Sequence, residues 1–575
     1  MIGTVEAVVR YPRVMDGSLM SRCFSRLLAA ALGVLAYSGA VAAQSLPPSV
    51  APGRLEQRFE RPATPQSLPP VEFPAPEQAP APDKAGAIRL VLRDLVFDGG
   101  TVYAAAELLP LYQSLLGQQI SLLDLYKVRD AITAKYRSEG YVLSLAVIPA
   151  QRIAGGVVHM ALVEGYVSVV RFEGPYTDGF GILNDYARRI REARPLRSAV
   201  LERYVMLMDD LPGISVHTVL KPAKSGEAGS DLTVVIERKP VGANVTLDNR
   251  GTPSVGPFQL DASVDLNDQF GVFDQTSIRG IIAPHVDELR YLDLSHTELL
   301  GLDGTTLVVG ARRNWSIPGS TVAQYGIKSE SSTLHTGLAY PLIRSRSETL
   351  RLTGDFTLRN SWTHANGAPI STDRVRMVSF GTSWDISDSW QGSNLFQAGF
   401  GQAVGGMGAY VSDKSRLDTQ LTFSKVTASA QRVQPLPGNF SVLLAADSQY
   451  TPNKLVSAEQ FGVGGKTYGR GFDSSAITGD KGASYKGELQ YTPGVEATWL
   501  KYVQLYGFGD YGKTWNYVDD RSETFQYLGS AGGGLRLGLG ERVSGNVEFT
   551  TPLTWKTTTN ENPGSRVYFS LSARY

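Results

Sequence analysis

The chain has 575 residues, too many for one ordinary globular domain, and its 55 Lys and Arg are matched by 55 Asp and Glu. Zero net charge argues against a nucleic-acid partner, because nucleic-acid-binding proteins normally carry a basic excess. The six His are scattered without metal-ligand spacing, and the only Cys, Cys23, lies in an apparent export signal, so we expect no metal, no cofactor and no disulfide.

The N-terminal region has the pattern of a secretory signal peptide. Arg22 and Arg26 supply a basic segment, Leu27 to Ala43 is an apolar run rich in Ala, and small residues precede Gln44. We therefore assign residues 1–43 to a signal peptide with Met20 as the true start; a long basic segment from Met1 is the alternative. A membrane anchor is disfavoured because the run is short.

Residues 44–87 are rich in Pro, Ala and Gln, and such sequence favours extended conformations that bury no core. We interpret them as a periplasmic linker, in which Arg54 to Arg61 can form one or two helical turns. No later stretch of about 18 uncharged apolar residues occurs. If the mature protein lies in a membrane, it must therefore cross it as a β-barrel.

Residues 88–165 predict a small α+β module in the order β-α-α-β-β. The expected elements are a strand at 88–97, a helix from about Val102 to Gly117, a helix that begins after Ser121 and ends at Gly140, and strands at 141–147 and 156–163. Ser121 with Asp124 has the spacing of a helix-capping box.

Residues 166–240 repeat this order. The expected elements are a strand at 167–172, helices at about 179–192 and 198–210, and strands at 214–220 and 232–238. Two consecutive units of similar length and element order constitute an internal repeat.

From residue 241 to 575, helical periodicity gives way to short alternating segments separated by turn residues. Apolar residues from Phe258 to Leu266 alternate with polar ones from Gln259 to Asn267, a pattern suited to a wall between lipid and a wet lumen. Sixteen candidate strands predict an antiparallel membrane barrel; a soluble β-sandwich is the alternative. The expected strands start near residues 243, 258, 275, 289, 305, 325, 347, 373, 393, 416, 439, 483, 501, 523, 543 and 565.

The longest interruption, about 452–482, contains Arg470-Gly471-Phe472 in a Gly-rich segment. Gly465-Lys466-Thr467 superficially resembles a phosphate-binding loop, but that signature requires Gly at position 460, which is Gln. We therefore expect no nucleotide. Two strands later, Phe508-x-Asp510-x-Gly512 places Asp510 on the lumenal face by alternation.

These motifs resemble those of a known family of proteins. Arg470-Gly471-Phe472 is similar to the loop-six tip, and Phe508, Asp510 and Gly512 to the strand-thirteen motif, of two-partner secretion transporters of the TpsB type. This haemolysin and filamentous-haemagglutinin secretion/activation family belongs to the outer-membrane protein 85 superfamily. Further matches lie in the two α+β units, which the resemblance identifies as POTRA modules: Tyr136–Tyr141, Val163–Tyr166, Glu202-Arg203 and Asp210–Gly213.

The resemblance implies a lumenal salt bridge between Arg470 and Asp510, in which the guanidinium fork engages the carboxylate bidentately. Gly469 departs from the family pattern, which usually has Val before the loop-six Arg. The few helical turns at Arg54–Arg61 are shorter than the family's plug helix, so the sequence leaves open whether a lumenal plug exists.

By resemblance, the protein is an outer-membrane transporter whose periplasmic part, residues 44–240, receives an unfolded exoprotein encoded nearby. Its other partner is outer-membrane lipid, and we expect a monomer without catalytic residues. An assembly factor for outer-membrane proteins, from the same superfamily, is the alternative. A porin would not need residues 88–240, and the scattered His offer no hydrolase triad.

Overall fold

The computed structural model describes residues 51–60, 63–67, 80–176, 178, 181–223, 229–412, 415–416, 418–495, 497–518, 522–557 and 562–575. The predicted signal peptide and about half of the linker lie outside these residues. None of the helices described is long and apolar enough to cross a bilayer. Within the same ranges, no cluster of three His, Cys, Asp or Glu side chains is placed to hold a metal ion.

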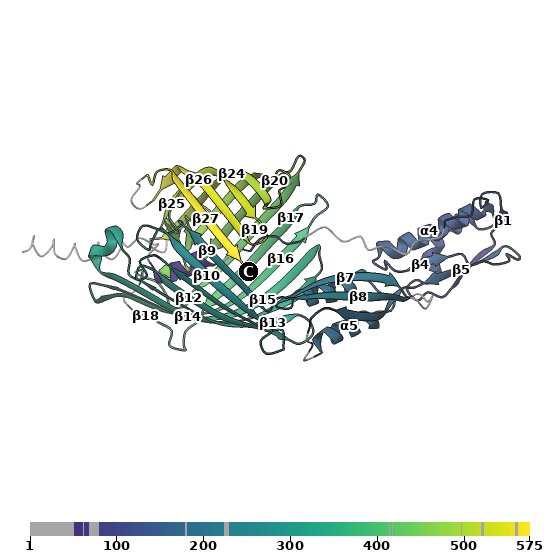
Figure 1. Ribbon diagram of the computed structural model, residues 1–575, viewed down its shortest axis with the longest axis horizontal. Helices are drawn as coiled ribbons and strands as arrows, with labels where there is room; N and C mark the ends of the chain where they lie inside the picture. Colours follow the sequence, from purple (N-terminus) through teal and green to yellow (C-terminus); the bar gives the residue numbers. More distant parts are fainter. Residues whose placement is uncertain are drawn as a thin grey trace, which may run out of the picture. The chain divides into compact units, whose positions relative to one another are not determined.

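A closed antiparallel barrel with sixteen strands forms the C-terminal part of the chain, as the alternating sequence predicts (Figure 1). The last strand pairs with the first, Ser570 opposite Asp248, so the sheet has no free edge. The short β18 (Tyr410–Ser412) pairs with β16 beyond the end of β17. The wall consists of β9 (Val241–Asp248), β10 (Gln259–Asn267), β11 (Gln275–Ile282), β12 (Arg290–Leu300), β13 (Thr305–Ser316), β14 (Ile327–Arg344), β15 (Glu348–Ala365), β16 (Ala368–Ser387), β17 (Ser393–Ala403), β19 (Ser424–Leu436), β20 (Phe440–Tyr450), β23 (Lys481–Tyr491), β24 (Leu500–Tyr517), β25 (Glu523–Leu539), β26 (Val543–Lys556) and β27 (Arg566–Arg574).

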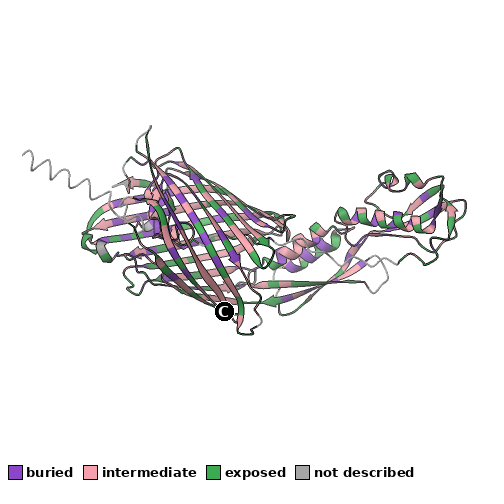
Figure 2. Cartoon of the chain, turned by 90° about the horizontal axis from the view of Figure 1, so that it is seen from above, coloured by how far each residue is buried: buried purple, intermediate pink, exposed green. Residues whose placement is uncertain are grey.

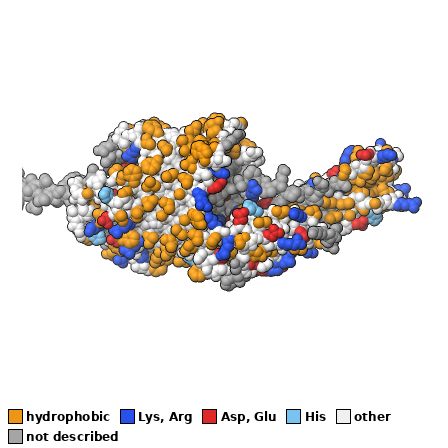
Figure 3. All heavy atoms as spheres, viewed as in Figure 1, with side chains coloured by type: hydrophobic (Ala, Val, Ile, Leu, Met, Phe, Trp, Pro, Cys, Tyr) orange, Lys and Arg blue, Asp and Glu red, His pale blue; other side chains and the backbone are white. Residues whose placement is uncertain are grey.

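The two faces of the wall differ in polarity. In β10, the side chains of Leu260 and Val264 are 39% and 38% exposed, whereas Gln259 and Ser263 are buried on the lumenal side. Figure 2 shows the same alternation of buried and exposed residues along many strands, and Figure 3 shows hydrophobic side chains spread over the visible outer face of the barrel. An apolar outer band around a polar interior is the arrangement that a lipid bilayer requires.

Most of the strands start within two residues of the predicted positions, but two do not. β16 starts at Ala368 instead of near 373, because Asn366 and Gly367 both have positive φ and make a tight hairpin from β15. β19 starts at Ser424 instead of near 416, since the preceding segment contributes β18 and a loop.

The first α+β module contains β1 (Arg89–Val91), β2 (Asp94–Asp98), α3 (Ala105–Leu108), β3 (Gln119–Ser121), α4 (Leu122–Ser138), β4 (Leu145–Val147) and β5 (Val157–Val163). As predicted, Ser121 and Asp124 form the capping box of α4. The α4 side chains of Leu125, Ile132 and Tyr136 are buried in the core of the module.

Two expectations for this module are wrong, and the strand expected at 141–147 is shortened to β4 (Leu145–Val147). The strand expected at 88–97 is divided into β1, which pairs with β3, and β2, which pairs with β5. The helix expected from Val102 to Gly117 is reduced to α3 and two 3-10 turns, η3 (Leu109–Leu111) and η4 (Gln113–Leu115). Pro110 lies in η3, and proline cannot donate the backbone hydrogen bond that continues an α-helix.

Glu164 connects three segments of this module. Its carboxylate accepts hydrogen bonds from the amides of Thr101 (2.7 Å) and Val102 (2.9 Å), from the Thr101 hydroxyl (2.7 Å) and from the Tyr136 hydroxyl (2.9 Å). Burial by itself would raise the pKa of Glu164, but the donors together hold it below its ordinary value of 4.5. Because the folded-state pKa is depressed, the stabilisation is present above the unfolded pKa and is lost as pH falls through the folded pKa.

We therefore expect Glu164→Gln to destabilise the module by about 1–2 kcal/mol at pH 7, because its amide group cannot satisfy all four donors. The measurement is hydrogen exchange of the amides of residues 88–165 in the full chain at pH 7 and pH 4. Glu173→Gln, at an exposed position, is the matched control. Equal protection in Glu164→Gln and wild type at pH 7 would contradict the expectation.

The second module repeats the arrangement with β6 (Tyr166–Glu173), α5 (Ile182–Glu192), α6 (Ser198–Asp209), β7 (Ile214–Pro222) and β8 (Gly229–Arg238). β8 is the central strand of a three-stranded sheet in the order β6-β8-β7. Leu183, Tyr186 and Ile190 of α5 and Leu201 of α6 are buried in one core with Val234 of β8. Both outer strands therefore keep one edge free of pairing within this sheet.

The second module contacts the end of β14 and the turns that follow β10 and β12. Asp210 accepts two hydrogen bonds from the Arg344 guanidinium, both at 2.6 Å, and Arg203 donates to the carbonyl oxygens of Pro341 and Asp303. Phe273, from the turn between β10 and β11, is only 1% exposed within the core of the module. Residues of the Glu202-Arg203 and Asp210–Gly213 matches thus join the module to the barrel.

Candidate functional site in the barrel lumen

The segment between β20 and β23 folds into the barrel. It contains a 3-10 turn, η6 (Ser457–Glu459), and a small hairpin of β21 (Phe461–Val463) and β22 (Ile477–Gly479). The hairpin lies against the wall, since β22 contacts β24 and β25. We call residues 451–480 loop six. Its tip carries the Arg470-Gly471-Phe472 motif predicted from the sequence.

Arg470 lies at the centre of a buried ionic cluster. Its backbone N–H donates to Asp510 Oδ2 (3.2 Å), and its Nε lies 3.4 Å from the same oxygen. Its Nη1 donates to Glu488 (3.0 Å) and to Glu548 (3.1 Å), and its guanidinium carbon lies 3.4 Å from the centre of the Phe508 ring. Arg470 and Asp510 therefore form an ion pair, but it is not bidentate, because the guanidinium is shared among three carboxylates.

These carboxylates come from three neighbouring regions of the wall: Glu488 from β23, Asp510 from β24 and Glu548 from β26. Two more arginines balance them, because Arg536 donates to Glu488 (2.7 Å) and Arg250 donates to Glu548. Three cations thus meet three anions around the loop-six tip. Buried charge is tolerated when it is paired and hydrogen-bonded in this way.

Sequence reasoning missed Glu488 and Glu548. Both had a signal, because each is an acidic residue at a lumenal position of an alternating strand: Glu488 precedes the outward Leu489, and Glu548 lies between the outward Val547 and Phe549. Alternation assigns the face. It does not show which inward residues meet the loop.

The other motif residues also lie at this contact. The amide of Gly471 donates to Ser530 Oγ (3.1 Å), which in turn donates to Asp510 (2.5 Å). Phe472 is buried in an apolar cluster with Tyr468 and Leu528. Gly512 lies under the Val463 side chain, so a Cβ there would collide with it.

Gly469 explains the departure from the family pattern. Its φ is +69°, a left-handed conformation that valine rarely adopts, and a Cβ at this position would lie 2.4 Å from Leu528 Cδ1. The turn before Arg470 therefore requires glycine in this chain.

The barrel contains a short plug helix, α2 (Pro52–Phe59). Its Glu56 accepts hydrogen bonds from Ser331 and Thr333 (2.8 Å) of β14, and the carbonyl of Phe59 accepts one from Arg279 (2.7 Å) of β11. These partners face the lumen, so the helix occupies the barrel interior. It is the helix predicted within Arg54–Arg61, displaced by two residues.

Helix α2 and loop six contact each other. Gln57 Nε2 donates to the Ala458 carbonyl (2.6 Å), and Arg359 of β15 lies between the two segments, 3.5 Å from Glu56 and 2.5 Å from Glu459. Lys425 of β19 also contacts Glu459 (2.7 Å). A polar network therefore links the plug helix, the base of loop six and the barrel wall.

The fold and the lumenal cluster define a class: outer-membrane barrels with periplasmic POTRA modules and an inward loop held at the wall. The sequence model of the haemolysin secretion/activation proteins ShlB/FhaC/HecB matches residues 229–537, more than half of the chain, and that of the ShlB-type POTRA domain matches residues 90–165. The protein belongs to this family of two-partner secretion transporters, the TpsB proteins of the outer-membrane protein 85 superfamily.

Similar proteins agree with this assignment. The outer membrane transporter CdiB of Escherichia coli strain 536 is 25% identical over 449 residues, which cover 76% of this chain and 74% of CdiB. The heme/hemopexin transporter protein HuxB of Haemophilus influenzae strain Rd is 22% identical over 468 residues, which cover 78% and 80%. The structure of CdiB from Escherichia coli has a TM-score of 0.71 at 22% identity, and the match covers 91% of this chain and 96% of CdiB. The protein is therefore located in the outer membrane, and its POTRA modules are periplasmic.

Proposed function

We propose that the protein receives one unfolded exoprotein through its POTRA modules and passes it through the barrel to the cell surface. The observation that most strongly supports this proposal is that α2 and loop six occupy the barrel lumen. Polar and ionic contacts hold α2 against the wall, and loop six combines its ionic cluster with two small apolar clusters, one around Phe472 and one around Leu455 and Val456. Two segments seated on a polar wall can be displaced without opening the barrel itself.

The POTRA sheets supply the means of capture. An extended chain can pair with a free strand edge, and backbone hydrogen bonds then give affinity without demanding a particular sequence. β6 and β7 of the second module have such edges, and this module contacts the barrel at the end of β14. It is therefore the module from which a client would enter the lumen.

Arg470 and Asp510 have the role of holding loop six in its seated position. The shared guanidinium, the Ser530 bridge and the buried Phe472 support this role, because each would be lost if the tip left the wall. An assembly factor remains the alternative function, and the match to the secretion family favours secretion over it. We further propose that the client is encoded nearby and that the transporter acts as a monomer in outer-membrane lipid.

Co-expression with the exported protein encoded beside it tests the proposal. We expect that protein to appear in the medium or on the cell surface only when the transporter is present. Other outer-membrane barrels, measured in the same cells, should be unchanged on deletion. Retention of the client in the periplasm together with a general loss of other barrels would favour the assembly factor instead.

A further inference from the structure

The outward face of β16 carries two arginines next to its apolar part. Val378 and Phe380 lie on this face, and alternation along the strand places Arg376 and Arg374 on the same face, nearer to the β15–β16 turn. The second POTRA module contacts the opposite end of the barrel, at the end of β14, so the β15–β16 turn is at the extracellular end. The two arginines therefore lie where the lipid-facing band of the wall ends toward the outer leaflet.

Arg376 is only 6% exposed, yet every group to which it donates is neutral. Its Nε donates to the Met407 carbonyl (2.9 Å). Its Nη1 donates to the carbonyls of Arg359 (3.1 Å) and Val375 (2.9 Å), and its Nη2 donates to Asn360 Oδ1 (3.0 Å). These oxygens satisfy the hydrogen bonds of the guanidinium but supply no opposite charge. Because a buried charge is tolerated best beside an opposite charge, this position favours an anion.

Arg374 adds a second positive charge two residues away. Its side chain makes no hydrogen bond or ion pair with any residue that the structure describes, and its Nε is buried without a partner. Tyr410 lies directly opposite in β18, with its ring centre 6.0 Å from the Arg374 guanidinium carbon. The adjacent carboxylate, Asp373, is buried on the lumenal side of the wall. Two like charges on one face, with no carboxylate between them, attract an anion from outside the protein.

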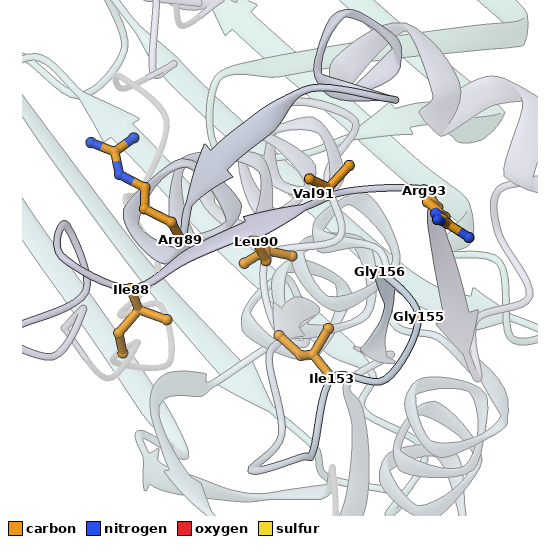
Figure 4. Close-up of a pocket in the computed structure, with 8 residues that line it drawn as sticks. All are labelled: Ile88, Arg89, Leu90, Val91, Arg93, Ile153, Gly155 and Gly156. Carbon is orange, nitrogen blue, oxygen red and sulfur yellow. The ribbon is translucent and has the colours of Figure 1, made fainter.

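The first POTRA module has another two arginines that make no ion pair within the described part of the chain. Arg89 and Arg93 are among the residues that line a hollow of about 320 Å³ beside β1 (Figure 4). Both side chains are exposed, and this module is periplasmic. Water solvates exposed cations of this kind, so they require no ligand. Arg374 and Arg376 differ because their face of the barrel borders lipid, where a charge normally has a partner.

We propose that Arg374 and Arg376 bind a phosphate of the phosphorylated glycolipid that forms the outer leaflet of the outer membrane. A guanidinium matches the oxygens of a phosphate, and basic residues at a membrane surface bind lipid headgroups. Arg374 contacts the phosphate, and Arg376 contributes its charge from behind. The acyl chains lie along Val378 and Phe380, and Tyr410, which is 51% exposed, lies at the level of the headgroup. This site goes beyond the proposed function, because the client takes no part in it.

Binding of diphosphoryl lipid A to the full-length protein in a neutral detergent tests the site. Native mass spectrometry measures the fraction of the protein that carries bound lipid as the lipid concentration is raised. We expect the wild type to bind this lipid at least fivefold more tightly than the same lipid with both phosphates removed. Excess inorganic phosphate should not displace the lipid, because a free phosphate gains nothing from the apolar surface at Val378 and Phe380.

Substitutions of Arg374 remove the phosphate contact without removing a hydrogen bond of the fold. Arg374→Gln should weaken lipid binding at least fivefold, and Arg374→Lys, which keeps the charge but loses the fork, should weaken it by a smaller factor. The matched control is Arg313→Gln on the outward face of β13, because Arg313 already has an acidic partner in Glu330 (3.5 Å). Arg89→Gln with Arg93→Gln is the control for arginines that face water. Both controls should bind the lipid as the wild type does.

Wild-type affinity for diphosphoryl lipid A in Arg374→Gln would overturn the proposal, and so would wild-type affinity in Arg374→Lys. Equal binding of the phosphorylated and dephosphorylated lipids by the wild type would show that the phosphate is not recognised, and would overturn it too. Displacement of the lipid by inorganic phosphate would assign the arginines to a free anion instead of a lipid. None of these results depends on secretion of the client, so failure of the proposed function leaves this test unaffected.

Discussion

Arg470→Ala is expected to reduce secretion of the client at least tenfold while the barrel still reaches the outer membrane. The substitution leaves Glu488, Asp510 and Glu548 without their shared cation. Removing one partner of a buried ionic contact costs about 3–5 kcal/mol, which weakens the attachment of the loop-six tip to the barrel wall. The measurement is secreted client at matched outer-membrane levels of transporter.

Because the Arg470 guanidinium is shared among three carboxylates, substitution of Asp510 and substitution of Arg470 are expected to reduce secretion to different extents. Asp510→Asn keeps an oxygen that can accept the Arg470 backbone N–H, and the contacts of Nη1 with Glu488 and Glu548 are untouched. Its effect should therefore be smaller than that of Arg470→Ala. Arg432→Ala, which breaks an ion pair with Asp388 away from loop six, is the matched control and should secrete normally. Equal secretion by Arg470→Ala and wild type would show that the contact of the loop-six tip with the barrel wall has no role in secretion.

Gly53→Leu is expected to raise single-channel conductance several-fold by expelling α2 from the lumen. A Cβ at Gly53 would lie 2.3 Å from the Ala458 Cβ, well inside van der Waals contact, so the helix and loop six cannot keep their present positions. Deletion of residues 52–59 should give a similar conductance. The measurement is conductance in planar lipid bilayers with the purified full-length protein.

The contact between residues 53 and 458 also allows a compensating substitution to restore the low conductance. Gly53→Ala should also raise conductance, and adding Ala458→Gly should lower it again because the colliding Cβ is gone. Gly86→Leu, at a position with no neighbouring atom within 4 Å of an added Cβ, is the matched control. If the deletion variant conducts as wild type does, α2 does not obstruct the pore, and the plug interpretation is wrong.

Local pattern was enough to predict much of the fold. Period-two alternation assigned the inner and outer faces of β10, and the Ser121 cap located the start of α4. The errors occurred where local pattern was overridden or misread. Pro110 interrupts an otherwise helical segment, and the tight turn at Asn366-Gly367 starts β16 five residues before the predicted position.

For the lumenal site, the sequence by itself determined the motif residues, the inward face of Asp510 and the resemblance that joined it to Arg470. Only the tertiary structure decided that Glu488 and Glu548 share that arginine, that Gly469 is required by its φ and by Leu528, and that α2 contacts the base of loop six. The physical reason is that alternation fixes the face of a strand but not its neighbours across the lumen. Those depend on how the strands stagger around the closed barrel and on how a thirty-residue loop folds back inside it.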